Sequence, residues 1–268
     1  MGIAPDAVIH PTALVETGAE VGAGARIGPF CVIGPEVQLG AGVELKAHVV
    51  VSGMTEIGAE TVVFPFAVLG EIPQDLKFAG ERTELRIGAR NRIREHVTIH
   101  PGTGGGGGLT EIGDDCLIMV GAHVAHDCRI GNGVILVNNA GIAGHVVIED
   151  DVIVGGLSGV HQWVRIGQGA MIGAVTFVAH DVIPYGLVQG PRGTLDGLNL
   201  VGLKRKGKSR AEIAALRAAF GQLAEGGGPF QDAARALPED SPLVRDVVAF
   251  VTAGSGRSFL TPAGHDGP

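Results

Sequence analysis

Large aromatic side chains are scarce in this chain of 268 residues, which has one Trp, one Tyr and an aromatic content of 4%. A compact core built around large rings is therefore not expected. Basic residues are also in the minority, because 20 Lys and Arg face 28 Asp and Glu and give a formal net charge of −8. Nucleic-acid binding by a broad basic face is disfavoured, since phosphate backbones attract positive surfaces.

Cysteines and long apolar runs are few as well. Three cysteines, an odd number, fit a reducing cytoplasm better than a disulfide framework, and we expect them to be small packing residues rather than metal ligands. No run of eighteen apolar residues occurs, so no transmembrane segment is predicted. The first residues have no basic stretch before an apolar run, which disfavours a secretory signal and favours a cytoplasmic location.

A six-residue repeat dominates the sequence. Aliphatic residues recur at every sixth position from Ile9 to Leu69, and a second series runs from Ile112 to Val178. Six is not a multiple of the helical repeat of about 3.6, so each unit is predicted to be a short strand and a turn. Three units close a triangular coil of eighteen residues, and the coils stack as parallel strands.

Two interruptions of the repeat predict loops that leave this prism, at 71–86 and at the glycine-rich 101–111. Beyond residue 190 the repeat ends and helical patterns begin, the first of which opens with the capping-box pair Ser209 and Glu212. These patterns cover 209–226, 230–237 and 242–253. We therefore expect a β-prism over 1–190 and a small α-helical domain over 191–268.

Stacked coils bring residues that are eighteen apart into one vertical column. Two adjacent columns contain polar groups: His126, Gly144 and Gln162 in the first, and Asp127, His145 and Trp163 in the second. His123 is predicted to lie beside them, at the preceding corner. Folding of the prism does not require ionisable groups at these positions, so the cluster predicts an active site.

The residue types in these columns favour acyl transfer to an alcohol. Histidine can take a proton from a hydroxyl near neutral pH, which makes His126 the candidate general base. The backbone N–H of Gly144, one coil above, has no side chain to shield it and can donate to an oxyanion. No serine lies in either column, so a covalent acyl-enzyme is disfavoured. The basic run 204–210 is either solvated, a clamp for the phosphate of a nucleotide, or a patch for an acidic partner.

Six segments are more specific than the repeat. They are QDLKFAGE (74–81), RNRIREHVTIH (90–100), GAHVAHDC (121–128), NNAGIAGHV (138–146), GVHQW (159–163) and GLKRKGKSR (202–210). Together they closely resemble the UDP-N-acetylglucosamine acyltransferases of lipid A biosynthesis. The resemblance implies a left-handed parallel β-helix with a small C-terminal α-helical domain that contacts the nucleotide. It also implies a cytoplasmic homotrimer with clefts between its subunits.

The implied reaction moves an (R)-3-hydroxyacyl group from acyl carrier protein to the 3-hydroxyl of UDP-N-acetylglucosamine. The donor chain is carried on phosphopantetheine, and no metal or further cofactor is implied. By resemblance, His126 is the general base, Asp127 is its polarising neighbour and Gly144 is the oxyanion donor. Substrate contacts are implied at Asp75, Lys77, His123, His145, Gln162, Asn199 and Arg205, the last two to the nucleotide.

The chain departs from the family pattern at positions that resemble the acyl groove and the nucleotide site. Ala174 replaces a glycine at the groove floor, where one methylene of misfit is worth roughly 1–3 kcal/mol, so we expect an acyl chain shorter than fourteen carbons. Arg192 replaces a histidine of the groove region. Val201 replaces an acidic residue near the uridine, and Lys206 replaces an arginine and loses its bidentate phosphate geometry.

Other interpretations stay open from the sequence. A hexapeptide-type carbonic anhydrase would bind zinc through three histidines across a subunit interface, for which His123, His126 and His145 are candidates. The N-acyltransferase that acts later in the same pathway also combines hexads with a histidine base. A prism of this kind can also serve as a trimeric spacer without activity. An acceptor sugar with a 3-amino group is a further alternative to the 3-hydroxyl.

Overall fold

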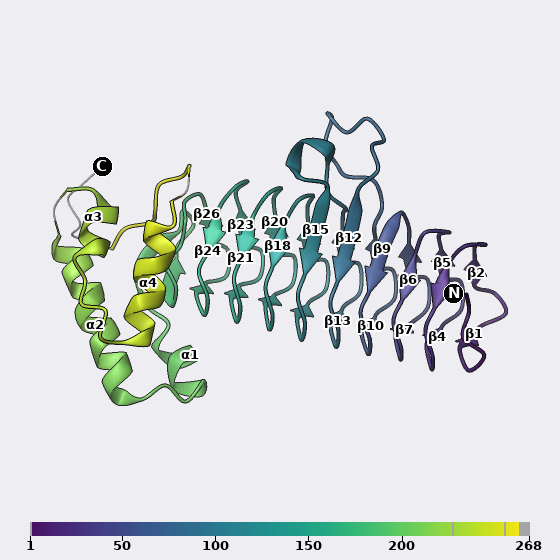
Figure 1. The fold of residues 1–268 in the computed structure, drawn as a ribbon, viewed down its shortest axis with the longest axis horizontal. Coiled ribbons are helices and arrows are strands. Elements are labelled where there is room, and N and C mark those ends of the chain that lie inside the picture. The colour runs from purple at the N-terminus through teal and green to yellow at the C-terminus, as the bar shows by residue number, and fades with distance from the viewer. Residues whose placement is uncertain (1, 227, 255, 263–268) are drawn as a thin grey trace.

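The computed structural model describes residues 2–226, 228–254 and 256–262. Figure 1 shows a long prism of stacked coils with helices gathered at its C-terminal end. The coils form a left-handed parallel β-helix, as the resemblance implies. No helix within the described residues is long and apolar enough to cross a bilayer.

Three sheets make the faces of the prism, because every third strand along the chain pairs with the next. Face I contains β1 (Val8–Ile9), β4 (Arg26–Ile27), β7 (Glu44–Leu45), β10 (Val62–Val63), β13 (Arg92–Ile93), β16 (Leu117–Ile118), β19 (Ile135–Leu136), β22 (Ile153–Val154), β25 (Met171–Ile172), β27 (Gly186–Gln189) and β28 (Thr194–Leu198). Pairing on this face is parallel up to β27, and β28 returns antiparallel to β27.

The other two faces are parallel throughout their described strands. Face II contains β2 (Leu14–Val15), β5 (Val32–Ile33), β8 (Val50–Val51), β11 (Val68–Leu69), β14 (Thr98–Ile99), β17 (His123–Val124), β20 (Gly141–Ile142), β23 (Gly159–Val160) and β26 (Phe177–Val178). Face III contains β3 (Glu20–Val21), β6 (Gln38–Leu39), β9 (Met54–Ile57), β12 (Glu84–Ile87), β15 (Leu109–Ile112), β18 (Arg129–Ile130), β21 (Val147–Ile148) and β24 (Arg165–Ile166). The chain passes from face I to face II to face III in each coil.

The repeat positions fill the interior as predicted. The aliphatic residue that ends each two-residue strand points inward, and from β3 to β26 it is buried. The three cysteines are free, and each is buried at an inward position. Burial raises the pKa of the Cys116 thiol to about 11 and that of Cys128 to about 12, so these thiols stay protonated packing groups.

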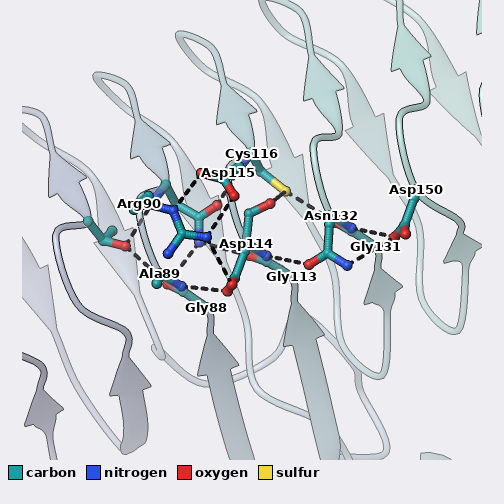
Figure 2. A network of polar contacts seen from close by, with 12 residues as sticks. Gly88, Ala89, Arg90, Gly113, Asp114, Asp115, Cys116, Gly131, Asn132 and Asp150 are labelled. Carbon is teal, nitrogen blue, oxygen red and sulfur yellow. Dashed lines mark hydrogen bonds and ion pairs between the residues drawn. The ribbon is translucent and has the colours of Figure 1, made fainter. Parts of the chain in front are cut away.

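Polar side chains join successive coils at the edge between faces III and I, as Figure 2 shows. The side-chain Oδ1 atoms of Asp114, Asn132 and Asp150 each accept a hydrogen bond from a backbone N–H one coil away, at 2.8, 2.8 and 2.7 Å. Arg90 adds an ion pair with Asp115, with 2.7 Å between nitrogen and oxygen. The side chains of this edge therefore satisfy the backbone N–H groups of the turns.

The two predicted loops rise from the prism next to β12 and β15 (Figure 1). Both are shorter than predicted, because β12 takes the end of the range 71–86 and β15 takes the end of 101–111. The second loop contains a short 3-10 turn, η1 (Gly104–Gly106). Both loops leave the prism before β12 and β15, on the N-terminal side of the strands that follow the polar columns.

Helices cover the C-terminal end of the prism. They are α1 (Leu200–Arg205), α2 (Arg210–Glu225), α3 (Phe230–Arg235) and α4 (Pro242–Thr252). The predicted capping box is present, with Ser209 and Glu212 bonding each other's backbone N–H groups. The pattern analysis did not predict α1, a six-residue helix that begins after the cap Asn199. Residue 190 lies between β27 and β28, so face I continues past it.

Candidate active site

The edge between faces II and III brings the two polar columns together. Residues 126–127, 144–145 and 162–163 form the turns of three successive coils, just before β18, β21 and β24. The N–H of His145 donates to the carbonyl of His126 at 3.0 Å, and the N–H of Trp163 donates to the carbonyl of Gly144 at 3.2 Å. The predicted vertical alignment is therefore confirmed.

His126 and Asp127 form a buried hydrogen-bonded pair. Nδ1 of His126 lies 2.8 Å from Oδ2 of Asp127, and the two side chains are 10% and 1% exposed. A carboxylate accepts, so Nδ1 donates and Nε2 is left as the basic nitrogen. Consecutive side chains of an extended chain point apart. The left-handed turn at Asp127, with φ of 58°, lets these two meet.

Gly144 leaves room for the imidazole of His126. A Cβ atom at residue 144 would lie 2.5 Å from Cε1 and 2.7 Å from Nε2 of His126, so any side chain there would displace the ring. Within the described part of the chain, no hydrogen-bond acceptor takes the N–H of Gly144. An unused backbone donor thus lies next to a basic imidazole, as an oxyanion site requires.

His145 and Trp163 continue the second column. Their rings stack with centroids 3.7 Å apart and an interplanar angle of 4°, while His126 meets His145 edge-on at 87°. Burial lowers the pKa of His145, although Asp127 acts in the opposite direction from 3.8 Å away. A neutral imidazole is therefore favoured at this position. Gln162 is exposed at the same edge.

A second pair of imidazoles lies one strand earlier. His123 is in strand β17 on face II rather than at a corner, which corrects the predicted placement. Its Nδ1 lies 2.8 Å from Oγ1 of Thr98, and its ring meets that of His100 edge-on. Burial and the charge of His123 lower the pKa of His100 to about 4, and burial also lowers the pKa of His123.

Sequence reasoning missed His100 because a loop changes the spacing. Thr98 pairs with His123 across an offset of 25 residues, not eighteen, since the loop before β15 lies between them. Matching the strand motifs on either side of the loop, rather than counting eighteen, would have found the neighbour.

The carboxylate of Asp127 is bonded on all sides. Thr103 donates its hydroxyl to Oδ2 at 2.6 Å and its N–H to Oδ1 at 2.9 Å. Burial raises the pKa of Asp127, but the hydrogen bonds from Thr103 and His126 outweigh it and keep the pKa below its usual value. Asp127 is therefore ionised at neutral pH, and the sequence analysis did not identify Thr103.

The first loop approaches the same edge. The N–H of Gln74 donates to Nδ1 of His100 at 3.2 Å, which fixes the loop against the prism. Asp75 accepts from the N–H of Lys77 at 3.0 Å. The charge of Asp75 raises the pKa of His145 and that of Lys77 lowers it, so both predicted residues act electrostatically on the second column.

The residues expected at the nucleotide lie elsewhere in the chain. Asn199 and Arg205 line a cavity of about 640 Å³ between the C-terminal strands of face I and α1. The Asn199 side chain accepts from the N–H of Gly202 at 2.9 Å and donates to the carbonyl of Gly169 at 3.0 Å, so it caps α1. Lys206 forms an ion pair with Asp151 at 2.5 Å.

The two residues expected in the acyl groove also lie away from His126 within one chain. Ala174 is exposed in the turn between β25 and β26, at the edge between faces I and II. Arg192 is exposed and forms a backbone bridge with Phe177, next to β26 on face II. A single chain therefore does not bring the groove residues to the edge that carries the imidazoles.

The groups that come close enough to share one ion differ from the predicted zinc set. Over the described ranges, ligand atoms within 4.8 Å of one another belong to His126, Asp127 and His145. His123 is not in this group and bonds Thr98 instead. Within the described residues of one chain, His123, His126 and His145 therefore do not gather around a common point as three zinc ligands.

Known proteins are similar to this chain in sequence and in fold. An acyl-[acyl-carrier-protein]–UDP-N-acetylglucosamine O-acyltransferase of Paracoccus denitrificans is 71% identical over 203 residues, which cover 75% of this chain and 77% of that protein. The protein of the same name from Agrobacterium fabrum is 46% identical over 219 residues, 80% of this chain and 81% of its own.

The chain belongs to this acyltransferase family. The family model described as UDP-N-acetylglucosamine O-acyltransferase, domain 2, matches residues 181–260, and the bacterial transferase hexapeptide model matches 18–53 and 109–144. The UDP-N-acetylglucosamine acyltransferase structure from Campylobacter jejuni superposes with a TM-score of 0.89 at 36% identity, covering 94% of this chain and 99% of that one. Membership of an acyltransferase family argues against the spacer and the zinc hydratase.

Proposed function

We propose that the protein transfers an (R)-3-hydroxyacyl chain from acyl carrier protein to the 3-hydroxyl of UDP-N-acetylglucosamine, the first step of lipid A synthesis, in the cytoplasm. The buried His126–Asp127 pair beside the open N–H of Gly144 is the observation that carries this proposal. Both substrates are part of the name of the relatives at 71% and 46% identity. Three free buried thiols are consistent with a reducing compartment.

The geometry supports direct attack with His126 as general base. Nε2 of His126 takes the proton from the sugar hydroxyl while its oxygen bonds to the thioester carbonyl carbon. Asp127 holds the Nδ1 proton and stabilises the imidazolium, and the N–H of Gly144 donates to the oxyanion. The intermediate then expels the thiolate of phosphopantetheine, which takes the proton from His126. Every proton is handled by these groups, so the step requires no metal or further cofactor.

The substrate contacts follow from the same edge. Asp75 and Lys77, in the first loop, and His145 and Gln162, on the columns, are proposed to contact the acceptor sugar. The neutral imidazole favoured at His145 suits hydrogen bonding to an uncharged sugar. His123, in β17 on face II, is the proposed substrate contact farther from the edge that carries His126. Asn199 and Arg205 would meet the nucleotide in the cavity beside α1.

We propose a homotrimer in which the site lies between subunits. The outward positions of face II are uncharged in its described strands: Leu14, Val32, Val50, Val68, Thr98, His123, Gly141, Gly159 and Phe177. The upper strands of face I present Leu117, Ile135, Ile153, Met171 and Leu187. Face III instead presents mostly charged residues to solvent. Extended apolar faces mark subunit contacts, and packing face I of one copy near face II of another would bring Asn199 and Ala174 toward a neighbour's His126.

The acyl chain is proposed to be shorter than fourteen carbons. The Ala174 methyl is exposed at the edge between faces I and II, so it is free to contact an acyl chain that lies along that edge. A misfit of one methylene costs roughly 1–3 kcal/mol, which is enough to change the preferred length. Arg192, exposed next to face II, adds a charged group near the same groove.

A transfer assay with acyl carrier protein thioesters of ten, twelve and fourteen carbons tests both the role of His126 and the acyl chain length. The wild-type protein should prefer the shorter donors, and His126→Ala should lower kcat by about 10²- to 10⁴-fold, the contribution of a general base. His10→Ala, an exposed histidine of the first coil, should be as active as wild type. Unchanged transfer by His126→Ala would refute the site. Preference for the fourteen-carbon donor would refute the chain length alone.

A further inference from the structure

The glycine-rich second loop lies directly over the Asp127 carboxylate. Thr103 in this loop is 5% exposed, and both its hydroxyl and its N–H point at Asp127, at 2.6 and 2.9 Å. Asp127 is 7% exposed as a residue, so water has little access to its oxygens. The loop therefore supplies the hydrogen bonds that solvent would otherwise supply.

We propose that Thr103 is a positioning residue for acyl transfer, which holds the Asp127 carboxylate in the orientation that fixes the tautomer and the ring of His126. The inference rests on the proposed function, since it assigns a role in that reaction. Thr103 does not touch the substrate in this proposal and acts only through Asp127.

Hydrogen bonds to both oxygens explain why Thr103 would control the pair. The terminal torsion of an aspartate is broad and roughly two-fold, so a carboxylate held by one bond can rotate. Thr103 fixes Oδ1 with its N–H and Oδ2 with its hydroxyl, and Oδ2 also faces Nδ1 of His126 at 2.8 Å. The backbone N–H of Asp127 is fixed as well, by Oγ1 of Thr110 at 2.8 Å. Carboxylate and imidazole are thus oriented before a substrate binds.

The hydroxyl of Thr103 is not used for local structure. Threonine before a helical turn usually caps it with its side chain. Thr103 precedes η1, yet its side chain makes no capping hydrogen bond and turns to Asp127 instead. The hydrogen bond of the Thr103 hydroxyl to Asp127, in place of a capping bond, therefore favours a positioning role over an ordinary turn-forming one.

Glycines in the loop allow the close approach. A Cβ atom at Gly106 would overlap the carboxylate carbon and Oδ2 of Asp127, and one at Gly102 would also crowd this side chain. The N–H of Gly104 donates to Oε1 of Glu81 at 2.9 Å. Glu81 belongs to the first loop, which carries Asp75 and Lys77, so the two loops are tied together next to the site.

Kinetics of Thr103→Val and Thr103→Ser test the proposal. Valine keeps the shape and the backbone N–H but removes the hydroxyl, and we expect kcat to fall about 10- to 100-fold with little change in either KM. Asp127 then loses a donor to its charged form, so the acid limb of the pH–rate profile should move to higher pH. Serine restores the hydroxyl and should return kcat to within a few-fold of wild type.

Thr55→Val is the matched control. Thr55 is also buried, and its hydroxyl bonds only the carbonyl of Ser52, at 2.7 Å on β9. It should change the melting temperature without changing kcat or the pH profile. A wild-type kcat and pH profile in Thr103→Val would overturn the proposal. So would a loss of kcat that follows the melting temperature and is not rescued by serine.

Wild type and His126→Ala in the same assay separate the two proposals. Transfer by wild type and its loss in His126→Ala uphold the proposed function whatever Thr103→Val does. Absence of transfer by wild type, or full activity of His126→Ala, would refute the proposed function itself.

Discussion

Two edges of the prism carry stacked rings at the same position of the coil, the second residue of a left-handed turn. The edge between faces I and II has four such rings, with centroids 4.9, 5.0 and 5.2 Å apart and angles of 18° or less, on Phe30, His48, Phe66 and His96. The edge between faces II and III stacks His145 on Trp163 in the same way. Coils about 4.8 Å apart make ring stacking the default arrangement of such a column.

The difference between the edges is a carboxylate and a covering loop. Asp127 takes the column position below His145 where a ring would continue the stack, and it draws His126 into an edge-on contact with His145. Within one chain the rings of the other edge are exposed, Phe30 by 55% and Phe66 by 50%, whereas the Asp127 side chain is 1% exposed. The edge between faces II and III thus differs from the structural edge in two features: a carboxylate interrupts its ring stack, and a glycine-rich loop covers that carboxylate.

Displacing the glycine-rich loop from the Asp127 carboxylate should have the largest effect on kcat. In Gly106→Ala the new methyl overlaps the Asp127 carboxylate, so either the loop or the acid must move. A displacement of about 1 Å at a reacting pair costs on the order of 10²-fold, and we expect that loss in kcat from steady-state kinetics. Gly105→Ala is the matched variant, because a Cβ there meets nothing within 4 Å. Equal activity of the two variants would contradict the role of the glycine-rich loop over Asp127.

Acid should reveal the buried imidazoles beside the reactive edge. Burial and His123 lower the pKa of His100 to about 4, while the unfolded chain titrates near 6.5. As the pH falls from about 6.5 to about 4, the unfolded chain takes up a proton that the folded protein refuses. Stability should therefore decrease over that window, by up to about 3 kcal/mol.

Denaturant unfolding of His100→Asn at several pH values measures this contribution. Asparagine keeps an acceptor for the N–H of Gln74 but does not titrate, so the decrease between pH 6.5 and 4 should become shallower. His48→Asn, at an exposed ring of the other edge, is the matched variant for replacing a histidine by asparagine. An identical slope in His100→Asn and wild type would show that the buried imidazole does not contribute.

The exposed stack should have the smallest effect. Phe66 contacts His48 and His96, so Phe66→Leu removes two ring contacts, whereas Phe30→Leu removes one. Ring pairs are worth about 0.5–1.5 kcal/mol, and exposure places these near the lower end. We expect Phe66→Leu to lower the free energy of unfolding by about 1 kcal/mol and Phe30→Leu by about half of that, with wild-type acyl transfer. A loss of transfer in Phe66→Leu would mean that this edge is not purely structural.

Some site contacts were predictable and others were not. The alignment of His126 with Gly144 followed from eighteen-residue counting, because no insertion separates their coils. The contact between His126 and Asp127 did not follow from this counting and was implied only by the family resemblance, because it depends on the left-handed turn at Asp127. His100 was missed because a loop changes the offset to His123. Thr103 was missed because a glycine run has no periodic signal.

The amino-acid sequence by itself determined the prism, its inward cysteines, its polar columns and the capped helix α2, because each is a local or strictly periodic constraint on burial or hydrogen bonding. Only the tertiary structure decided which groups hold the Asp127 carboxylate and that the two loops are tied through Glu81 and Gly104. The path of a loop depends on contacts between residues far apart in the chain, and no repeat encodes those contacts.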